Sequence, residues 1–597
     1  MFSMRKLSTT LILLLSILVI GATAFAQTSK GIIAGTVRDT TGAVMSGATV
    51  TAKNIATGES RTTTTSEVGN YRIEAVEPGS YQIKVTAANF KTTTIDKLEV
   101  KGSVITTLNA DLAVGQASET IEVEAKSIEI ATENGQLSHS ISTVEVQQIP
   151  VFNLNAISLV MTQPGVIDVG ANSFSNGTGF SVNGSRPRAN NFLLDGQDDN
   201  DNSIQGQALQ PANLQAVQEV AILTNSYSAE FGRGGGSVTN IISKSGTNQF
   251  HGSAWDLYAG SGLNAIPAES GLAGQTQATK PRFDTHTFGF TAGGPIWKNK
   301  LFAFGSSEWQ RFYGKAAPGA IRVPTDAGIA ALQAAGTPNA ALLQQYFGAL
   351  RGDPSQTPRT IDIGVRPGCP AASLSPTGTC LVQTGLTIRP APAQLNPNLQ
   401  WTTKIDFTPR PADSISGRYI RNSGNLTPDF ANFPTSTPGL DPQQGGVSEN
   451  MGFTWTHILS SRAVNEFRAS YGHFDFSFGP TPEAAKNPLF PLPNLAIAGT
   501  SFPGLGINSA LPQGRGHVTY QFQDAYTLTM GRHTFKAGAD VARLIVKDTI
   551  PFNSRGILTF GTGGGFSGLG NFIDNFTGGS SGATPPSGYG APLDEGT

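Results

Sequence analysis

The sequence predicts a fold dominated by β-strands: an N-terminal β-sandwich, a mixed α+β segment and then strands of a transmembrane β-barrel. Three observations predict this class. Only 14% of the 597 residues are charged, against about 25% in ordinary soluble proteins, and glycine is abundant at 70 residues. Short stretches near the N-terminus alternate apolar and polar side chains, as half-buried strands do. Further along, alternating stretches of about ten residues carry aromatic side chains, which is typical of strands that cross a membrane.

The first 26 residues predict export. Arg5 and Lys6 form a short basic region, and an apolar run from Leu11 to Ile20 follows it. Ala24 and Ala26 then place small side chains where a signal peptidase reads the chain. We therefore expect a secretory signal peptide that is cleaved after Ala26. No other long apolar run occurs in the sequence, so any embedding in a membrane has to come from strands.

Residues 27–114 predict a β-sandwich. Tyr81, Ile83 and Val85 fall on one face of an alternating stretch, with polar side chains between them. Turn-forming residues separate such stretches at short intervals, which is typical of an antiparallel sandwich of roughly seven strands. Two segments, GTVRDTTGAVMSGATV and GNYRIEAVEPGSYQIKV, resemble the carboxypeptidase regulatory-like domain, a transthyretin-type sandwich also likened to starch-binding modules. The resemblance implies an accessory domain without catalytic residues.

Residues 115–126 predict an extended linker. β-branched and acidic side chains alternate in it, so a strand is expected, although the sequence offers it no obvious partner. The segment resembles the TonB box, which implies that a TonB-type inner-membrane energy-coupling protein binds it by strand addition. The alternative is that it is the last strand of the sandwich or a plain linker. The expected coupling residues are Glu119, Thr120, Ile121, Glu122 and Val123.

Residues 127–247 contain two longer motifs, SVNGSRPRANNFLLDGQDDND and LQAVQEVAILTNSYSAEFGRGGGSVTNIISKSGTN. In this order they resemble the α+β plug domain of TonB-dependent receptors, which blocks an outer-membrane barrel. The resemblance implies a strand and a basic turn before Leu-Leu-Asp-Gly, and later a helix, a strand, a glycine-rich loop and a second strand. The signature residues are Asn183, Gly184, Arg186, Arg188, Leu194, Asp195, Gly196, Gly232, Gly234, Gly235 and Gly236.

The residues themselves predict some local details of this region. Leu214, Val217 and Val220 have the spacing of one face of a short helix. Ser237 to Ser243 predicts a strand, entered from residues 232–236, where glycines allow positive φ and close approach of backbones. Two arginines of the signature are expected to pair with acids on the barrel wall. The run of four aspartates is expected in a solvated loop, or alternatively around a hard cation: Asp195, Asp198, Asp199 and Asp201.

Residues 248–597 predict the N-terminal part of an outer-membrane β-barrel. From 518 to 530 the even positions are mainly apolar or aromatic and the odd positions mainly polar, as in a strand between lipid and a polar lumen. Residues 315–398 and 480–515 are rich in Pro, Gly and Ala and predict long loops that form the recognition surface outside the cell. Cys369 and Cys380 lie in the first of these loops. In an exported protein a disulfide is expected between them, the alternative being two free thiols.

The barrel is expected to be incomplete. We count roughly ten strand candidates after residue 250, whereas a barrel that holds a plug needs about 22. An open sheet would leave unpaired backbone groups in lipid, where each costs several kcal/mol. The sequence also ends in a loop-like stretch instead of a strand with a terminal aromatic residue. A piece of a longer protein is therefore expected.

No motif predicts an enzyme or a cofactor. None of the seven histidines lies in a zinc-peptidase pattern, and the net charge of −2 gives no field for nucleic acid. The order of domains resembles the Oar-like branch of TonB-dependent receptors in the Gram-negative outer membrane, with the N-terminal domain in the periplasm. That implies energised uptake of an unidentified glycan, peptide or polymer, with outer-membrane lipid around the barrel. Two alternatives remain: an adhesin or structural outer-membrane protein, and a carbohydrate-binding surface protein that acts through its sandwich.

Overall fold

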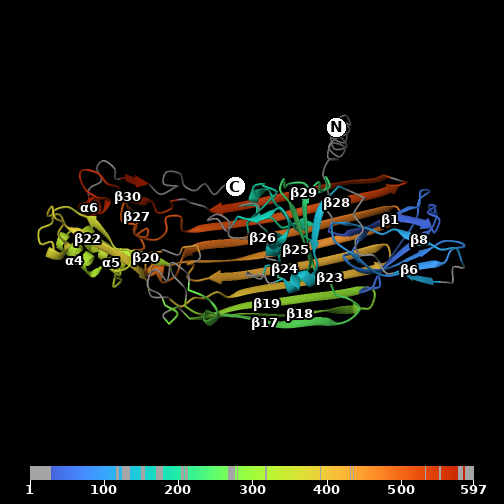
Figure 1. The fold of residues 1–597 in the computed structure, drawn as a ribbon, viewed down its shortest axis with the longest axis horizontal. Coiled ribbons are helices and arrows are strands. Elements are labelled where there is room, and N and C mark those ends of the chain that lie inside the picture. Colours follow the sequence, from blue (N-terminus) through green and yellow to red (C-terminus); the bar gives the residue numbers. More distant parts are fainter. Residues whose placement is uncertain are drawn as a thin grey trace, which may run out of the picture.

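The computed structural model describes residues 29–575 and 582–584, with internal gaps. The gaps are 116–119, 124–134, 150–154, 170–178, 204–207, 209–212, 267–275, 279, 281, 316–318, 390–391, 431, 434–435, 532 and 550–552. The expected cleavage residues Ala24 and Ala26 therefore lie outside the described residues, and so does Glu119. Figure 1 shows the sandwich at one end, a long sheet with the plug in the middle, and a second folded body at the other end. Among the described residues no helix is long and apolar enough to cross a membrane.

The N-terminal sandwich consists of two sheets. One has the strand order β3-β2-β5-β6-β9, and in the other β1 lies between β4 and β7 and also pairs with β8. Ile33, Val50 and Ile83 are among the fully buried residues of the core between the sheets. The sequence predicted an antiparallel sandwich, but β1 pairs in parallel with β7 and β8. The strands are β1 (Gly31–Asp39), β2 (Thr49–Asn54), β3 (Ser60–Thr64), β4 (Asn70–Val76), β5 (Gly79–Thr86), β6 (Thr92–Val100), β7 (Ile105–Thr107), β8 (Ala110–Leu112) and β9 (Thr120–Val123).

The expected coupling segment has a partner that the sequence did not reveal. Four of its residues form β9, which pairs in parallel with β6 in a register that places Thr93 opposite Ile121. This arrangement matches the alternative reading, in which the segment is the last strand of the sandwich. Within the described chain β9 is an edge strand, since β6 is its only neighbour in the sheet.

The plug is built around a five-stranded sheet with the order β10-β15-β16-β13-β14. The predicted helix around Leu214 to Ala221 is wrong, because residues 217–225 form strand β15. The apolar spacing suited a helix face, but β15 pairs with β10 on one side and β16 on the other, and this pairing decides the structure. The elements are β10 (Leu137–Ile141), α2 (Thr143–Gln148), η1 (Ala156–Thr162), β11 (Val166–Asp168), β12 (Phe180–Val182), η2 (Pro187–Ala189), β13 (Asn191–Leu194), β14 (Gln197–Asp198), β15 (Val217–Asn225) and β16 (Val238–Ser243).

The central sheet has nine antiparallel strands, and the outermost two, β17 and β29, each pair on one side only within the described chain. Short turns join its hairpins at the end that faces the sandwich: the Thr63 hydroxyl donates to the Ser461 carbonyl in one of them. The strands are β17 (His251–Gly260), β18 (Phe283–Trp297), β19 (Leu301–Gly314), β23 (Asn398–Arg410), β24 (Asp413–Leu426), β25 (Pro442–Ser460), β26 (Ala463–Pro480), β28 (Gln513–Met530) and β29 (His533–Thr549); η3 (Ser261–Leu263) follows β17.

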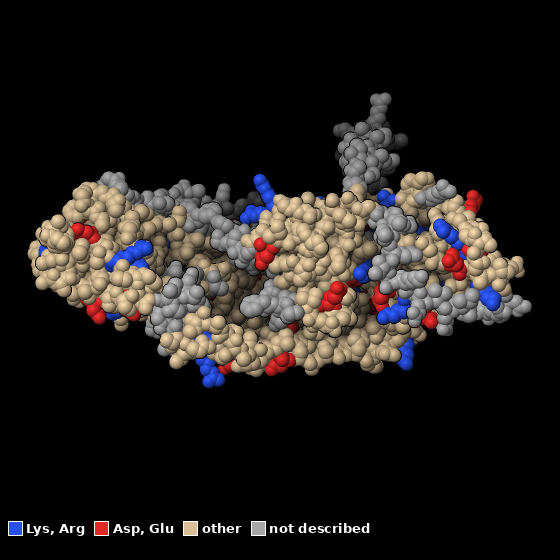
Figure 2. Space-filling view, in the orientation of Figure 1, with Lys and Arg blue, Asp and Glu red and all other residues tan. Residues whose placement is uncertain are grey.

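In strand β28 the apolar side chains are exposed and the polar ones buried, the reverse of a strand in a soluble protein. Phe522 is 54% exposed, whereas the neighbouring Gln523 is 1% exposed, and Tyr520 and Gln521 repeat the pattern. The polar face lies against the plug and the apolar face points outward, as the alternation predicted. Figure 2 looks onto the side on which the plug lies over the sheet, so the outward face of the sheet is on the far side of this view. Asp524, which interrupts the apolar face, accepts a hydrogen bond from Asn465 Nδ2 (2.8 Å) on β26.

The segments predicted as long loops fold into a compact body, here called the loop domain. It contains the elements between β19 and β23, between β26 and β28, and after β29, and they share one hydrophobic core with Leu440 of the segment between β24 and β25. Sequence signals for its helices are present: Thr325 and Thr337 are N-caps, and Pro338 opens the second helix. The elements are β20 (Ala320–Pro324), α4 (Asp326–Ala335), α5 (Pro338–Phe347), β21 (Arg359–Asp362), η4 (Ala371–Ser373), β22 (Leu381–Ile388), η5 (Ala484–Lys486), β27 (Asn494–Ile497), β30 (Ile557–Phe560), α6 (Gly568–Ile573) and β31 (Gly582–Thr584).

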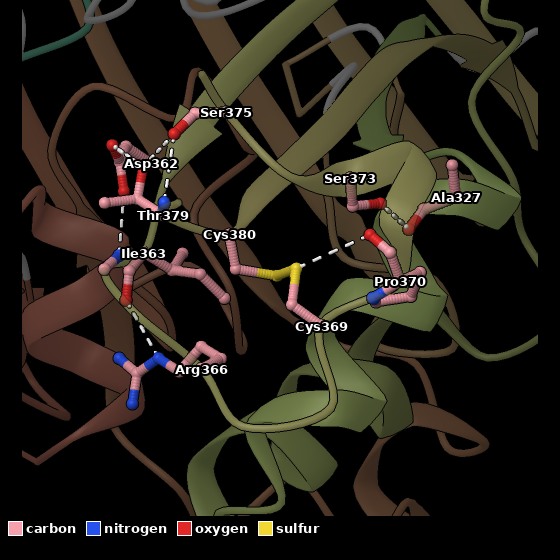
Figure 3. The surroundings of a disulfide bond; sticks show 11 residues. Ala327, Asp362, Ile363, Arg366, Cys369, Pro370, Ser373, Ser375, Thr379 and Cys380 are labelled. Carbon is pink, nitrogen blue, oxygen red and sulfur yellow. Dashed lines mark hydrogen bonds between the residues drawn. A yellow bond between two sulfur atoms is a disulfide. The ribbon is translucent and has the colours of Figure 1, made fainter. Parts of the chain in front are cut away.

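A disulfide between Cys369 and Cys380 lies in the loop domain, as Figure 3 shows. The Cys380 side chain is fully buried in the shared core, and Cys369 packs against it. The flanking chain is held by short-range bonds, such as the one from Arg366 Nε to the Ile363 carbonyl (2.9 Å). The bond therefore fixes a turn-rich segment onto the apolar core.

Replacing both cysteines with alanine is expected to destabilise the loop domain by about 2–4 kcal/mol, because the closed loop restricts the unfolded chain. The loss should appear as faster cleavage of the loop domain by protease on intact cells, while the heat-modifiable shift of the barrel stays unchanged. A Ser375→Ala variant, which keeps the disulfide, serves as the control. Equal cleavage rates in the cysteine variant and the unmodified protein would contradict a stabilising role for the bond.

Candidate functional site

The Leu-Leu-Asp-Gly motif forms a tight hairpin in the plug. Strand β13 ends at Leu194 and β14 begins at Gln197, so Asp195 and Gly196 are the two central residues of the turn. Their φ values of 50° and 77° are both positive, as a type I′ turn requires. Asp and Gly are the residues that adopt this conformation at least cost, which explains their place in the motif.

The turn aims the Asp195 carboxylate at both the plug and the barrel. Within the plug it accepts hydrogen bonds from the backbone N–H (2.9 Å) and the hydroxyl (2.6 Å) of Ser243. From the barrel it accepts one from Arg418 Nη1 on β24 (2.5 Å). Burial alone would raise the pKa of the Asp195 carboxyl, but Lys404 and Arg418 outweigh burial and hold this pKa at about 2. The carboxylate is therefore charged at any physiological pH.

Arg418 is the barrel's main contact with this hairpin. Its side chain is 3% exposed. Besides Asp195, it donates to the Leu194 carbonyl (3.0 Å) and to Gln197 Oε1 (3.1 Å) of the plug. A fourth bond, to Asn450 Oδ1 on β25 (2.7 Å), orients the guanidinium from the barrel side. One barrel side chain thus binds three of the four residues of the turn.

Other plug acids are also buried. Asp198 pairs with Arg233 of the glycine-rich loop (2.7 Å), and Asp201 pairs with Arg515 of β28 (2.9 Å). Asp199 has no exposed surface. The expected solvated loop is therefore wrong, because the barrel and the plug itself cover these aspartates. Among the described residues no group of three or more His, Cys, Asp or Glu side chains has the geometry to hold a metal ion.

The expected direction of charge pairing is also wrong. Arg186 and Arg188 are exposed, and within the described part of the chain neither forms an ion pair. The barrel instead provides the cations and the plug the acids: Arg418 binds Asp195, and Lys536 of β29 binds Glu230. The sequence alone could not reveal these partners, which lie more than two hundred residues apart.

Glycine is required in the glycine-rich loop mainly because neighbouring atoms lie close to its backbone, and not because the backbone has positive φ angles. None of its four signature glycines has a positive φ, whereas Arg233 between them has a φ of 70°. A Cβ at Gly234 would lie 2.7 Å from the Ala189 carbonyl oxygen, and one at Gly236 would meet Ser185 and Asn190 below 3 Å. Gly232 and Gly235 have open space around them. The expectation of close packing therefore holds for two positions, and that of positive φ is wrong for all four.

The other turn of the signature resembles the first. Asn183 and Gly184 have φ values of 50° and 76°, again a two-residue turn with both angles positive. The Asn183 side chain donates to the Thr224 carbonyl (3.2 Å), which joins the turn to β15. In both motif turns, residues that tolerate positive φ allow the chain to reverse its direction within two residues.

Comparison with known proteins identifies these parts. The model of an "Outer membrane beta barrel domain" matches residues 242–589, and that of a "TonB-dependent Receptor Plug Domain" matches residues 134–238. The chain belongs to the TonB-dependent receptor family. The "Carboxypeptidase regulatory-like domain" matches residues 32–113 of the receptor. The receptor is accordingly a protein of the Gram-negative outer membrane, in a family whose members are not enzymes.

The receptor is similar to the TonB-dependent transporter Oar of Myxococcus xanthus. The two are 25% identical over 569 residues, which cover 88% of this chain and 50% of Oar. The chain therefore spans about half the length of this relative. Among solved structures, the outer membrane transporter YddB of Escherichia coli has a TM-score of 0.43 at 11% identity, covering 71% of this chain and 50% of YddB. The siderophore receptor PirA of Acinetobacter baumannii has a TM-score of 0.41 at 14% identity, covering 69% and 48%.

Proposed function

We propose that this receptor takes up an extracellular ligand through a plugged β-barrel, with energy from a TonB-type inner-membrane protein. The observation that carries the proposal is the interface between plug and sheet. It is polar and charge-paired throughout the contacts described above, whereas the opposite face of the sheet is apolar. A plug held by ion pairs and amide hydrogen bonds can exchange these contacts for water when it moves, at less cost than an apolar core.

The proposed coupling segment is β9. As an edge strand it offers main-chain groups to a further strand, which is the mode of recognition expected for a TonB-type partner. It lies on the sandwich, at the end of the molecule where the barrel has short turns. Bacterial outer-membrane barrels place short turns in the periplasm, so this arrangement puts the sandwich and β9 within reach of an inner-membrane partner.

The loop domain is the proposed recognition surface, at the opposite end of the barrel. It contains a cavity of about 310 Å³ lined by Arg389, Tyr346 and mainly apolar neighbours. Arg389 is held by Asp441 (2.6 Å) and stacks on Phe430 (4.0 Å). Within the described residues, its Nε and the Tyr346 hydroxyl are buried without a hydrogen-bond partner. Both residues line the cavity, and we propose that these two donors bind an acceptor group on a glycan, peptide or polymer when the ligand displaces the atoms that cover them.

Tyr346→Phe is expected to leave the folding of the loop domain intact and to weaken ligand capture. Burial raises the pKa of Tyr346 to about 12, so its hydroxyl is a neutral donor. Losing one hydrogen bond of about 1 kcal/mol lowers affinity roughly fivefold. The probe is the material that the full-length receptor captures from fractionated growth medium. Unchanged affinity would exclude this cavity from the recognition surface.

Uptake itself is tested with the same captured material, radiolabelled, on cells that express the full-length receptor. We expect accumulation that stops when the energy-coupling protein is deleted or the proton gradient is collapsed, while binding at the surface persists. Equal accumulation with and without the coupling protein would contradict the proposal. Binding without any accumulation would favour the adhesin alternative.

We also propose that further strands pair with β17 and β29 in the membrane. Both edges carry exposed apolar side chains, such as Tyr258 on β17 and Val541 on β29. Unpaired backbone groups at these edges would each cost several kcal/mol in hydrocarbon, so the sheet needs closure. Hydrogen exchange of the full-length protein in detergent checks this: the amides of β17 and β29 should be as protected as those of β24.

A further inference from the structure

Two turns of the sandwich form hydrogen bonds with the plug. Gly102, in the turn after β6, donates its backbone N–H to both carboxylate oxygens of Glu219 on β15 (3.1 and 3.2 Å). The next residue, Ser103, accepts a hydrogen bond from Asn240 Nδ2 on β16 (2.9 Å). From the turn before β5, the Pro78 carbonyl accepts one from Gln218 Nε2 (2.9 Å). Adjacent strands of the plug are thus bonded to the same side of the sandwich.

Glu219 is the centre of this contact, here called the latch. Its side chain belongs to the buried residues, at 5% exposure, and it also accepts a hydrogen bond from the Ser140 hydroxyl on β10. Burial raises the pKa of the Glu219 carboxyl, against the bonds from Ser140 and Gly102 that lower it. One carboxylate therefore joins two plug strands to the sandwich in a site closed to water.

The fit around Gly102 is close. A Cβ at this position would lie 2.1 Å from Ile242 Cδ1 of β16 and 2.8 Å from the backbone oxygen of Ser29. Glycine is therefore needed here because the plug and the sandwich both press on the turn. Because the contact is packed as closely as a protein interior, the two domains cannot shift at this point without opening it.

The sandwich also contacts the barrel. Lys30 Nζ donates to the Thr456 hydroxyl of β25 (2.8 Å) and pairs with Glu77 of the sandwich (2.8 Å). Asn248, in the segment before β17, donates its backbone N–H to the Ala56 carbonyl (2.9 Å) and its Nδ2 to the Thr57 carbonyl (2.7 Å). The Lys30 contact is buried like the latch, since Lys30 is 4% exposed, and Lys30 also lies 3.9 Å from the Glu466 carboxylate of β26.

A single strand joins the coupling segment to the latch. β9 pairs with β6 along Thr92 to Ile95, and β6 then runs to Val100, immediately before the turn that binds Glu219. Hydrogen-bonded strands loaded along their length share force across the whole ladder of bonds. A pull on β9 thus passes into β6, and from β6 into the turn at Gly102.

We propose that the sandwich and the plug move as one body, with Glu219 as the positioning residue that locks them together. The role of this body in transport rests on the proposed function: force applied at β9 reaches the plug through β6 and the latch. The locking itself does not depend on transport. The sandwich is then a rigid extension of the plug and not an accessory domain on a flexible linker.

The test measures distances in the full-length receptor in detergent by pulsed electron paramagnetic resonance. One spin label is placed on the sandwich at Lys84→Cys and one on the plug at Gln147→Cys, both exposed positions. The native cysteines are joined in the disulfide, so only the new ones react. Glu219→Ala is expected to broaden the distance distribution and add a second population. Glu219→Gln, which still accepts from Gly102, should keep a single narrow peak.

Two further variants keep the test decisive. Gly102→Ala disturbs the latch from the sandwich side without removing a charge and should broaden the distribution in the same way. Glu230→Ala removes another plug glutamate, one that contacts Lys536 of the barrel, and should leave the distribution unchanged. A single narrow distribution in both Glu219→Ala and Gly102→Ala would overturn the proposal. The measurement uses no ligand and no coupling protein, so a failure of uptake in cells leaves its result valid.

Discussion

Replacing Arg418 with alanine is expected to destabilise the docked plug by about 3–5 kcal/mol, the usual cost of breaking a buried ion pair from one side. The variant leaves Asp195 buried with one cation fewer, and it removes one donor from the Leu194 carbonyl. Lys404 still lies close enough to lower the pKa of Asp195, so the lower end of this range is expected. We expect the full-length variant to fold as a barrel whose plug unfolds first.

Two measurements check this expectation on the purified full-length receptor. Urea should unfold the plug at a lower concentration than in the unmodified protein, and planar bilayers should show open-channel conductance. The control is Arg421→Ala on the same strand, since Arg421 pairs with Glu449 in a half-exposed position. Such a pair is worth about 0–1 kcal/mol. Identical behaviour of the two variants would mean that Arg418 does not anchor the plug.

Ile121→Pro is expected to abolish accumulation of ligand while binding at the cell surface persists. Proline removes one backbone donor from β9 and so weakens strand pairing on the side to which that N–H points. Successive N–H groups of a strand point to opposite sides, so Glu122→Pro removes a donor from the other side. One variant therefore loosens β9 from β6, and the other blocks addition of a partner strand.

Ile121→Val is the matched control, because it keeps the donor and the preference for an extended chain. Uptake of the captured, radiolabelled material is compared in the three variants, together with binding to whole cells. Unchanged uptake in both proline variants would remove the coupling role from residues 119–123. Loss of surface binding as well would indicate that the variants fail to reach the outer membrane.

The barrel strands were predictable because their chemistry is periodic. Successive residues of β28 face outward and toward the plug in turn, so apolar and polar residues alternate in its sequence. Phe522 and Gln523 were therefore assigned to opposite faces correctly. The strand β15 was not, because apolar residues at Val217 and Val220 suit a helix and a strand buried on both faces equally. Pairing with β10 and β16 selects the strand, and pairing of distant segments leaves no local signal.

The plug signature was predictable in its motifs but not in its partners. A local signal for the type I′ turn was available in the pair Asp195-Gly196, although no turn was predicted there. That its carboxylate meets Arg418 depends on how the plug is docked, which no spacing encodes. A local signal for the two helices of the loop domain was available at Thr325 and Thr337-Pro338, but the surrounding Pro and Gly residues favoured a loop prediction. β9 shows the same limit, since its partner strand could only be found in three dimensions.

The loop domain constrains the order in which the receptor folds. β27 pairs in parallel with β30, and Asn339 Nδ2 donates to the Phe572 carbonyl (2.7 Å), so its core joins segments that six strands of the central sheet separate along the chain. Contacts of such long range form late. The disulfide, by contrast, closes a short local loop and can form while the chain is still in the periplasm. A folded loop domain on the cell surface therefore indicates that the barrel strands between its segments have already been inserted into the membrane.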